Sequence, residues 1–334
     1  FLVFCMAVIR AVHLHGDLLR AVIASSGNDH RLGANEAPPA IISIFLGDQL
    51  TDIFEQIEQG SITGSKSTGT MTIGVDTLPP LPKHAGDRNR TSPFAFTGNK
   101  FEFRAVGSSQ SIAGPLVALN TIVAESLDQY ATDLEKATGG DPEQLPAAVE
   151  QLLHREITAH KAVIFNGNGY APEWQEEAAR RGLPNLRATP EALATLITPE
   201  NIALFEAYGV LSRREMESRH EIYMERYCKD LNTEANTALE LARKMILPAG
   251  YRYQGELVDT ATKLAALGQS AHLGTLEKLT ALVHECEQRI DALQAAVDHD
   301  AAGNVTAEAE HFHRQVVPAM QLSLIHISEP TRPR

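Results

Sequence analysis

The sequence predicts an α+β fold, in which a part built on an antiparallel sheet precedes an all-helical part. The segment Lys100-Phe101-Glu102-Phe103-Arg104 alternates between charged and aromatic residues, as expected of a strand whose successive side chains point to opposite faces. Beyond the turn at 139–142, Gly-Gly-Asp-Pro, apolar residues recur at helical spacing. We therefore predict one domain at 1–138 and a helical bundle domain at 139–321.

The elements of the first domain follow from periodicity and from end signals. It is predicted to contain helices at 2–24, 48–59 and 111–137 and strands at 40–46 and 100–104. Gly27 and Gly60 follow the first two helices, and glycine is the usual residue just beyond a helix. Between 61 and 98 the chain is rich in Gly, Ser, Thr and Pro without periodicity, which is typical of a lid or a binding loop.

The second domain is predicted to be helical throughout. Helices are expected at 143–165, 172–182, 190–196, 199–208, 212–247 and 254–267. Apolar residues then recur in alternating steps of three and four, at Leu276, Leu279, Val283, Cys286, Ile290, Leu293 and Val297. Such a heptad seam predicts an antiparallel helical hairpin packed within a bundle.

Composition narrows the classes of protein. The 334 residues carry a formal net charge of −13, which argues against a non-specific nucleic-acid binder. Cys5, Cys228 and Cys286 lie far apart, so we expect free buried thiols and neither a disulfide framework nor a zinc site. With no apolar run long enough to span a bilayer, we expect a soluble cytoplasmic protein with no nucleic-acid or membrane partner.

The two ends are unusual for a natural chain. The first residue is Phe1, and the apolar opening lacks the small-residue cleavage site of a signal peptide, so we interpret it as a helix entered midway. Residues 322–334 resemble the translation of a transposase adapter used in sequencing libraries. We therefore expect an artefact at 322–334 and a gene fragment cut at both ends.

Three segments carry the candidate site residues. Lys100, Glu102 and Arg104 share one strand face, at roughly 6.5–7 Å between neighbours, while Phe101 and Phe103 are expected to be buried on the other. The plainest interpretation of the charged row is a solvated sheet face. The alternative is an anionic ligand, held by the arginine and, through a metal, by the carboxylate.

Further cations accompany this row. The polar loop 28–39 contains Arg31 and Glu36, and the stretch before the strand contains Arg88 and Arg90. Cationic donors around a few carboxylates suit phosphoryl transfer to or from a carboxylate substrate. Glu102 alone cannot hold Mg²⁺, so more ligands are expected from the missing N-terminal part.

These segments resemble, in order, three motifs of glutamine synthetases. Gly-Asn-Asp-His-Arg-Leu-Gly-Ala-Asn-Glu-Ala-Pro-Pro at 27–39 is similar to a segment of the type III subfamily, Asn89-Arg90-Thr91 to the family's Asn-Arg-Ser, and 100–104 to its Arg-x-Glu-x-Arg strand. The helical C-terminal region also fits type III, whose chains are long. The resemblance extends to about Gln321.

The resemblance implies an ATP-dependent ligase that joins ammonia to L-glutamate through a γ-glutamyl phosphate, with Mg²⁺ or Mn²⁺, in a ring-shaped homo-oligomer with shared active sites. Arg31 would bind the glutamate carboxylate, and Glu36 would sit on a flap and take a proton from bound ammonium. Arg90 and Arg104 would stabilise the phosphoryl group in flight.

The same resemblance implies further roles on the strand. Arg104 would also bind substrate, Lys100 and Arg90 would face the nucleotide, and Glu102 would be one metal ligand. Two departures stand out: Lys100 replaces an arginine, and the spacing from Arg31 to Glu36 is one residue shorter than the common pattern.

Two other functions stay open. One is a related ligase that joins glutamate to another amine, although Glu36 favours ammonia. The other is a non-catalytic helical interaction protein, against which the five charged residues Arg31, Glu36, Arg90, Glu102 and Arg104 argue together. For the glutamine synthetase interpretation we predict that the fragment alone is inactive. The run at 166–169, Asn-Gly-Asn-Gly, is interpreted as a turn.

Overall fold

The computed structural model describes residues 1–31, 40–60, 64, 70–71, 81–82, 89–299 and 303–328. They form two compact units, Phe1–His220 and Glu221–Arg334. The division falls within helix α10 (Arg213–Leu241), so residues 139–220 pack with the first unit. The boundary predicted after residue 138, between the first domain and the helical domain, stays a prediction.

Nine α-helices lie wholly within the described part of the first unit. They are α1 (Leu2–Leu14), α2 (Gly16–Ala21), α3 (Ser26–Asp29), α4 (Gly47–Gln59), α5 (Ala113–Thr138), α6 (Leu145–His160), α7 (Pro172–Arg180), α8 (Thr189–Ala194) and α9 (Pro199–Ala207). Three 3₁₀ turns accompany them, η1 (Pro142–Gln144), η2 (Lys161–Val163) and η3 (Thr195–Ile197). α4 ends before Gly60, which has φ 68°, as its sequence signal predicted.

The single helix predicted at 2–24 is instead two helices followed by a short third one. His15 separates α1 from α2 with φ −121°, which lies outside the helical range. Ser25 then caps α3, because its hydroxyl oxygen accepts a hydrogen bond from the backbone N–H of Asn28 at 3.2 Å. The helical geometry is therefore interrupted twice before the chain reaches Arg31.

A three-stranded mixed sheet lies in the first unit, in the order β1 (Ile44–Phe45), β4 (Phe94–Phe96) and β5 (Phe101–Phe103). β1 runs parallel to β4, and β4 pairs antiparallel with β5 so that Ala95 lies opposite Glu102. Ile164 adds a parallel bridge on the other side of β1. The strand predicted at 100–104 is confirmed over 101–103. A separate pair joins β2 (Thr70–Met71) and β3 (Leu81–Pro82).

Aromatic rings cover the face of the hairpin opposite its charges. The ring centroid of Phe94 lies 5.8 Å from that of Phe101 and 5.5 Å from that of Phe103. Phe94 is buried, but Phe101 and Phe103 are half-buried, which corrects the expectation that both are buried. The aromatic face of β5 is therefore covered incompletely.

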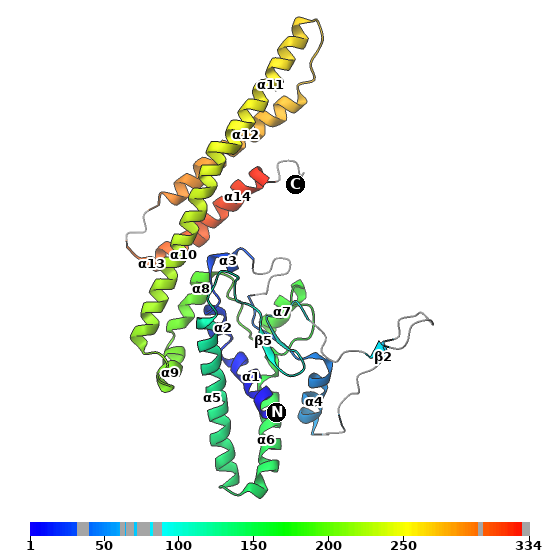
Figure 1. The fold of residues 1–334 in the computed structure, drawn as a ribbon, viewed down its shortest axis with the longest axis vertical. Helices are drawn as coiled ribbons and strands as arrows, with labels where there is room; N and C mark the ends of the chain where they lie inside the picture. Colours follow the sequence, from blue (N-terminus) through cyan, green and yellow to red (C-terminus); the bar gives the residue numbers. More distant parts are fainter. Residues whose placement is uncertain are drawn as a thin grey trace. The chain divides into compact units, whose positions relative to one another are not determined.

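Helices form the larger part of the core of the first unit. α5 and α6 pack against each other and both pack against α1, which is drawn in blue in Figure 1. α1 is apolar on most sides, and Met6 and Ile9 are fully buried. A helix of this kind is stable when neighbours cover most of its apolar side chains, and α5 and α6 cover much of α1, although Phe4 and Leu14 remain exposed.

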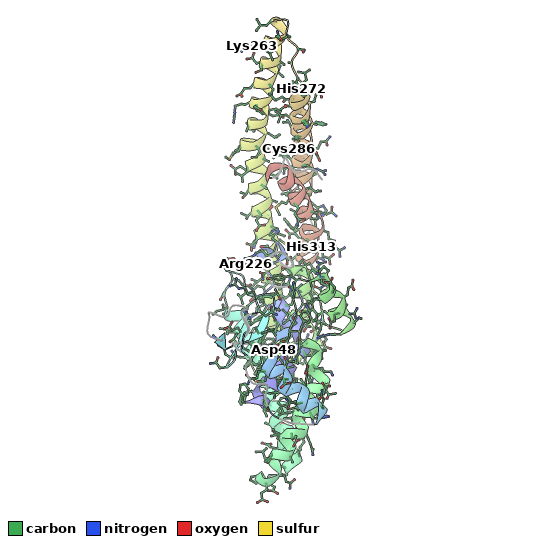
Figure 2. All side chains as sticks on the ribbon, turned by 90° about the vertical axis from the view of Figure 1, so that its right-hand side faces the viewer. Asp48, Arg226, Lys263, His272, Cys286 and His313 are labelled. Atoms are coloured by element: carbon green, nitrogen blue, oxygen red, sulfur yellow. The ribbon has the colours of Figure 1, made fainter. Side chains whose placement is uncertain are left out.

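The second unit is built from α10 and from helices in the last third of the chain. They are η4, a π-helical turn (Ala242–Ile246), α11 (Leu247–Ala266), α12 (Gly274–Val297), α13 (Val305–His311), the π-helical turn η5 (Phe312–Val316) and α14 (Val317–Ser328). α11 and α12 form a hairpin, and Figure 2 shows Lys263 and His272 near its turn with Cys286 farther along α12.

The heptad seam on α12 is buried in its C-terminal half. Val283, Cys286, Ile290 and Leu293 are buried, whereas Leu276 and Leu279 are half-buried. Both α11 and α14 pack against α12. A third helix therefore covers part of the seam. In the described part of the chain, no helix is both long and apolar enough to cross a membrane.

Candidate active site

The charged face of β5 carries two linked ion pairs. Nζ of Lys100 lies 3.0 Å from Oε1 of Glu102, and Nε of Arg104 lies 3.7 Å from Oε2 of the same carboxylate. The side chain of Lys100 is 66% exposed, whereas those of Glu102 and Arg104 are 34% and 27% exposed. The predicted plus, minus, plus row is therefore confirmed, and its last two members are partly shielded from water.

Arg104 presents a donor that the described residues leave without a hydrogen bond. Its Nε is buried, and 3.7 Å to Glu102 is an ion-pair distance that is too long for a hydrogen bond. A buried donor without an acceptor costs free energy. An oxygen of a bound anion is the kind of acceptor that would remove this cost.

Arg31 lies in the turn after α3, in a segment that is tied to the end of β5. The buried side-chain amide of Asn28 donates to the carbonyl oxygens of Ile23 and, at 3.3 Å, of Ala105. Arg31 follows three residues later, with its backbone N–H bonded to the Asn28 carbonyl at 3.0 Å, and is exposed. Its segment and that of Arg104 are therefore neighbours. Glu36 lies outside the described residues.

A buried ion pair fixes the end of α3. Nη2 of Arg20 lies 3.3 Å from Oδ1 of Asp29, and the side chain of Arg20 is only 1% exposed. Burial lowers the pKa of Arg20, and the charge of Asp29 opposes this shift. Asp29 also accepts hydrogen bonds from Thr189, the first residue of α8. The segment before Arg31 is thus bound to a helix far along the chain.

Arg90 sits in a tight turn close to the start of β4. Oδ1 of Asn89 accepts hydrogen bonds from the backbone N–H of Thr91 at 2.8 Å and from its hydroxyl at 2.7 Å, which is an Asx-type turn. The backbone N–H of Arg104 donates to the Pro93 carbonyl at 2.7 Å. The Asn28 side chain and this backbone hydrogen bond therefore bring the segments of Arg31, Arg90 and Arg104 together. Arg88 lies outside the described residues.

Sequence reasoning missed the role of the loop at 166–170. The side-chain amide of Asn89 donates to the Gly167 carbonyl at 3.0 Å, and the backbone N–H of Gly169 donates to the Thr91 hydroxyl at 2.8 Å. The two glycines two residues apart were the available signal, because glycine marks close backbone approach. Their partner 78 residues earlier cannot be seen in the sequence.

A second group of titratable side chains lies between α1, α5 and α6. Nη1 of Arg10 lies 2.6 Å from Oε2 of Glu125, and Nδ1 of His13 lies 2.9 Å from Nδ1 of His160. Burial raises the pKa of Glu156, but hydrogen bonds from His160 and Arg155 outweigh it and lower this pKa to about 2. Burial and the neighbouring His160 lower the pKa of His13. This cluster joins three helices of the core.

A separate cavity lies elsewhere in the first unit. It measures about 700 Å³ and lies between α4 and the end of α6. An ion pair crosses it, from Nζ of Lys161 to Oε1 of Glu58 at 2.5 Å. None of the predicted site residues that the structure describes lines this cavity.

The described residues offer only part of a metal site. No group of three or more His, Cys, Asp or Glu side chains in the described ranges is arranged to hold a metal ion. Glu102 is the carboxylate on the charged strand face, and it could supply one oxygen ligand.

Similar proteins place these features in one family. Residues 148–265 match the model of the glutamine synthetase C-terminal domain. The chain is 43% identical to the type-3 glutamine synthetase of Dictyostelium discoideum over 332 residues, which cover 96% of this chain and 44% of that protein.

Two bacterial proteins give the same result. The glutamine synthetase of Bacteroides fragilis is 36% identical over 93% of this chain and 43% of its own length. That of Butyrivibrio fibrisolvens is 42% identical over 77% of this chain and 36% of its own length. The chain thus spans less than half the length of these relatives. From its three ordered motifs and this similarity, the chain belongs to the glutamine synthetase family.

Proposed function

We propose that the whole protein containing this chain is an ATP-dependent ligase that joins ammonia to L-glutamate. The observation that carries the proposal is Arg104, whose buried Nε has no hydrogen-bond acceptor among the described residues and lies beside Glu102. An arginine next to a carboxylate suited to a divalent cation fits a phosphoryl-transfer site. The names of the three relatives support the same reaction.

The proposed reaction has two steps. The γ-carboxylate of glutamate attacks the γ-phosphorus of ATP, so that ADP leaves and γ-glutamyl phosphate forms. Ammonia then attacks the γ-carbonyl carbon, and inorganic phosphate leaves as L-glutamine forms. In this proposal Glu36 first attracts the ammonium cation and then accepts a proton from it. The ammonia that results attacks the γ-carbonyl carbon.

Each cation of the site has a separate task in this proposal. Arg31 binds the carboxylate of glutamate, for which a guanidinium offers a two-pronged match. Arg90 and Arg104 stabilise the charge of the phosphoryl group during transfer, and Arg104 also contacts substrate. Lys100 and Arg90 face the nucleotide. The exposed ammonium of Lys100 serves there as a point charge.

Glu102 would hold Mg²⁺ or Mn²⁺ as one of several ligands. Its carboxylate is a hard oxygen donor, the type that these ions prefer. The remaining ligands would come from residues outside the described part of this chain. When bound, the ion would neutralise phosphate charge, while Arg104 and Lys100 hold the Glu102 carboxylate in place.

The assembly and location of the whole protein are also proposals. We propose a ring-shaped homo-oligomer whose neighbouring subunits complete each other's active sites, with this chain inactive alone. We place it in the cytoplasm, where ATP is available and where free thiols such as the buried Cys5, Cys228 and Cys286 persist. A ligase that uses another amine is the second candidate, and Glu36 favours ammonia over it.

The test expresses the complete gene and assays γ-glutamyl transfer with Mg²⁺ or Mn²⁺. We expect Glu102→Ala and Arg104→Ala each to abolish activity with unchanged folding. Glu256→Ala and Arg252→Ala, at exposed positions of α11, are the matched controls and should retain it. A folded, assembled wild-type protein without activity would favour the non-catalytic interaction protein. Higher turnover with methylamine than with ammonia would favour the other ligase.

A further inference from the structure

We propose that the loop at 166–170 is a positioning element for Arg90. The inference rests on the proposed role of Arg90 in phosphoryl transfer, and it adds residues of the C-terminal domain to the machinery. The loop forms hydrogen bonds with the side chains of both neighbours of Arg90, and in this proposal it thereby fixes the position from which Arg90 presents its guanidinium.

A circuit of hydrogen bonds connects the loop to the turn of Arg90. The backbone N–H of Gly169 donates to the hydroxyl of Thr91, and this hydroxyl donates to Oδ1 of Asn89. The amide nitrogen of Asn89 donates back to the carbonyl of Gly167. Both neighbours of Arg90 are therefore bonded to the loop. Arg90 itself stays exposed, with its side chain available to a ligand.

The loop is anchored to the sheet and to the start of α4. Oδ1 of Asn166 accepts hydrogen bonds from the backbone N–H groups of Leu46 at 3.0 Å and Gly47 at 3.3 Å. Its amide nitrogen donates to the hydroxyl of Thr51 at 2.8 Å. One residue earlier, the N–H of Phe165 donates to the Ile44 carbonyl at 2.9 Å. Both polar atoms of the Asn166 side chain are hydrogen-bonded, and these bonds fix the start of the loop relative to α4.

Gly169 lies too close to the turn for any side chain. A Cβ atom at this position would lie 2.5 Å from the carbonyl oxygen of Thr91, which is a backbone atom and cannot rotate away. Glycine is needed here for close approach of two backbones. An alanine would therefore push the turn and Arg90 away from the loop, and would lengthen or break the hydrogen bond to Thr91.

Displacing Arg90 should lower kcat and leave the KM for glutamate nearly unchanged. A displacement of a catalytic group by about 1 Å can slow an enzyme on the order of 100-fold. Because the segment of Arg31 is fixed by Asn28 and Asp29 and not by this loop, the KM for glutamate should stay within about twofold of the wild-type value. A general loss of folding would lower the fraction of active enzyme but would leave no specific dependence on Arg90.

The experiment is a double-mutant cycle in the full-length enzyme. Gly169→Ala is combined with Arg90→Ala, and kcat and the KM for glutamate are measured for all four proteins. Gly255→Ala is the control, because a Cβ at this helical position meets no atom within 4 Å. We expect Gly169→Ala to lower kcat at least about tenfold in the wild type and less than about twofold in the Arg90→Ala background.

Thr91 supplies a second route should Gly169→Ala not fold. Thr91→Val removes the hydroxyl that joins Gly169 to Asn89, whereas Thr91→Ser retains it. We expect Thr91→Val to lower kcat and Thr91→Ser to restore it, with melting temperatures within a few degrees of each other.

The outcomes distinguish the positioning role of the loop from the proposed role of Arg90 in phosphoryl transfer. If Arg90→Ala leaves kcat unchanged, the proposed role of Arg90 is wrong. If Arg90→Ala lowers kcat but Gly169→Ala and Thr91→Val do not, the positioning inference is wrong while the role of Arg90 stands. An equal loss from Gly169→Ala in both backgrounds would also overturn it, because the loop would then act on something other than Arg90.

Discussion

Asp29 accepts two hydrogen bonds from Thr189, one from its backbone N–H at 2.8 Å and one from its hydroxyl at 2.7 Å. The two residues are 160 positions apart, and the same carboxylate pairs with the buried Arg20. The segment that leads to Arg31 is therefore held by a charge pair and by the first residue of α8. Region 139–220 supports the candidate site at this point, as the loop at 166–170 does at Arg90.

Asp29→Ala is predicted to destabilise the first unit strongly. The substitution leaves the guanidinium of Arg20 buried without its charge partner, and loss of one member of a buried pair costs about 3–5 kcal/mol. The free energy of unfolding from urea titration measures the effect. Adding Arg20→Met should recover part of the loss, because the uncompensated charge is then gone. A loss below about 1 kcal/mol in Asp29→Ala would contradict this account.

Lys100→Ala is predicted to change function and leave stability nearly intact. Its ion pair with Glu102 is solvent-exposed, and such pairs contribute less than about 1 kcal/mol. In the full-length enzyme the KM for ATP should rise several-fold, because a point charge at the proposed nucleotide site is lost. Lys100→Arg should keep the lower KM. An unchanged KM for ATP in Lys100→Ala would remove Lys100 from the nucleotide site.

The first unit should lose stability as the pH falls. The pKa of Glu156 is lowered from 4.5 to about 2, so its stabilising contribution is complete above 4.5 and is lost between 4.5 and 2. The pKa of His13 is lowered from 6.5, so its contribution is likewise lost as the pH falls below 6.5. Glu156→Gln should reduce the pH dependence between pH 5 and 3, by on the order of 2 kcal/mol.

The matched control for this titration is Glu150→Gln, at an exposed position of the same helix. It should keep the wild-type dependence of the free energy of unfolding on pH. Equal slopes in the wild type and Glu156→Gln would show that the carboxylate of Glu156 does not govern acid stability.

Leu293→Ala is predicted to destabilise the second unit. Leu293 is 1% exposed on the buried half of the α12 seam, and removing a buried leucine side chain costs about 2–5 kcal/mol. Leu267, which is 77% exposed after α11, is the control, and Leu267→Ala should change stability by less than about 0.5 kcal/mol. Thermal unfolding followed by circular dichroism distinguishes the two. Similar losses from both would mean that the seam is not the core of this unit.

Local signals explain which elements could be predicted. α4 is amphipathic and ends before Gly60, and both features lie within the 13 residues of the helix and the glycine that follows it. The alternation around Glu102 likewise specifies the strand and its charged face, because a strand has a period of two. The break at His15 was not predicted, although Gly16 directly after it is a local signal for a helix end, because the apolar residues on both sides fit one helical period.

Long-range contacts explain what could not be predicted. The bonds of Asn28 to Ala105 and of Asp29 to Thr189 join residues 77 and 160 positions apart, and no period or spacing records such a pairing. The motifs identified Arg31, Arg90 and Arg104, whereas their relative placement depends on these contacts. Glu36 lies outside the described residues, so its role stays a prediction.

Ile44 pairs with Ile164, and Thr91 with Gly169, so segments made early in protein synthesis depend on partners that are made much later. A ribosome adds roughly 5–20 residues per second, so roughly 4–16 s pass between the addition of Thr91 and that of Gly169, 78 residues later. During this interval the nascent turn of Arg90 lacks its partners. A chaperone that binds newly made chains would therefore encounter the turn before the loop can secure it.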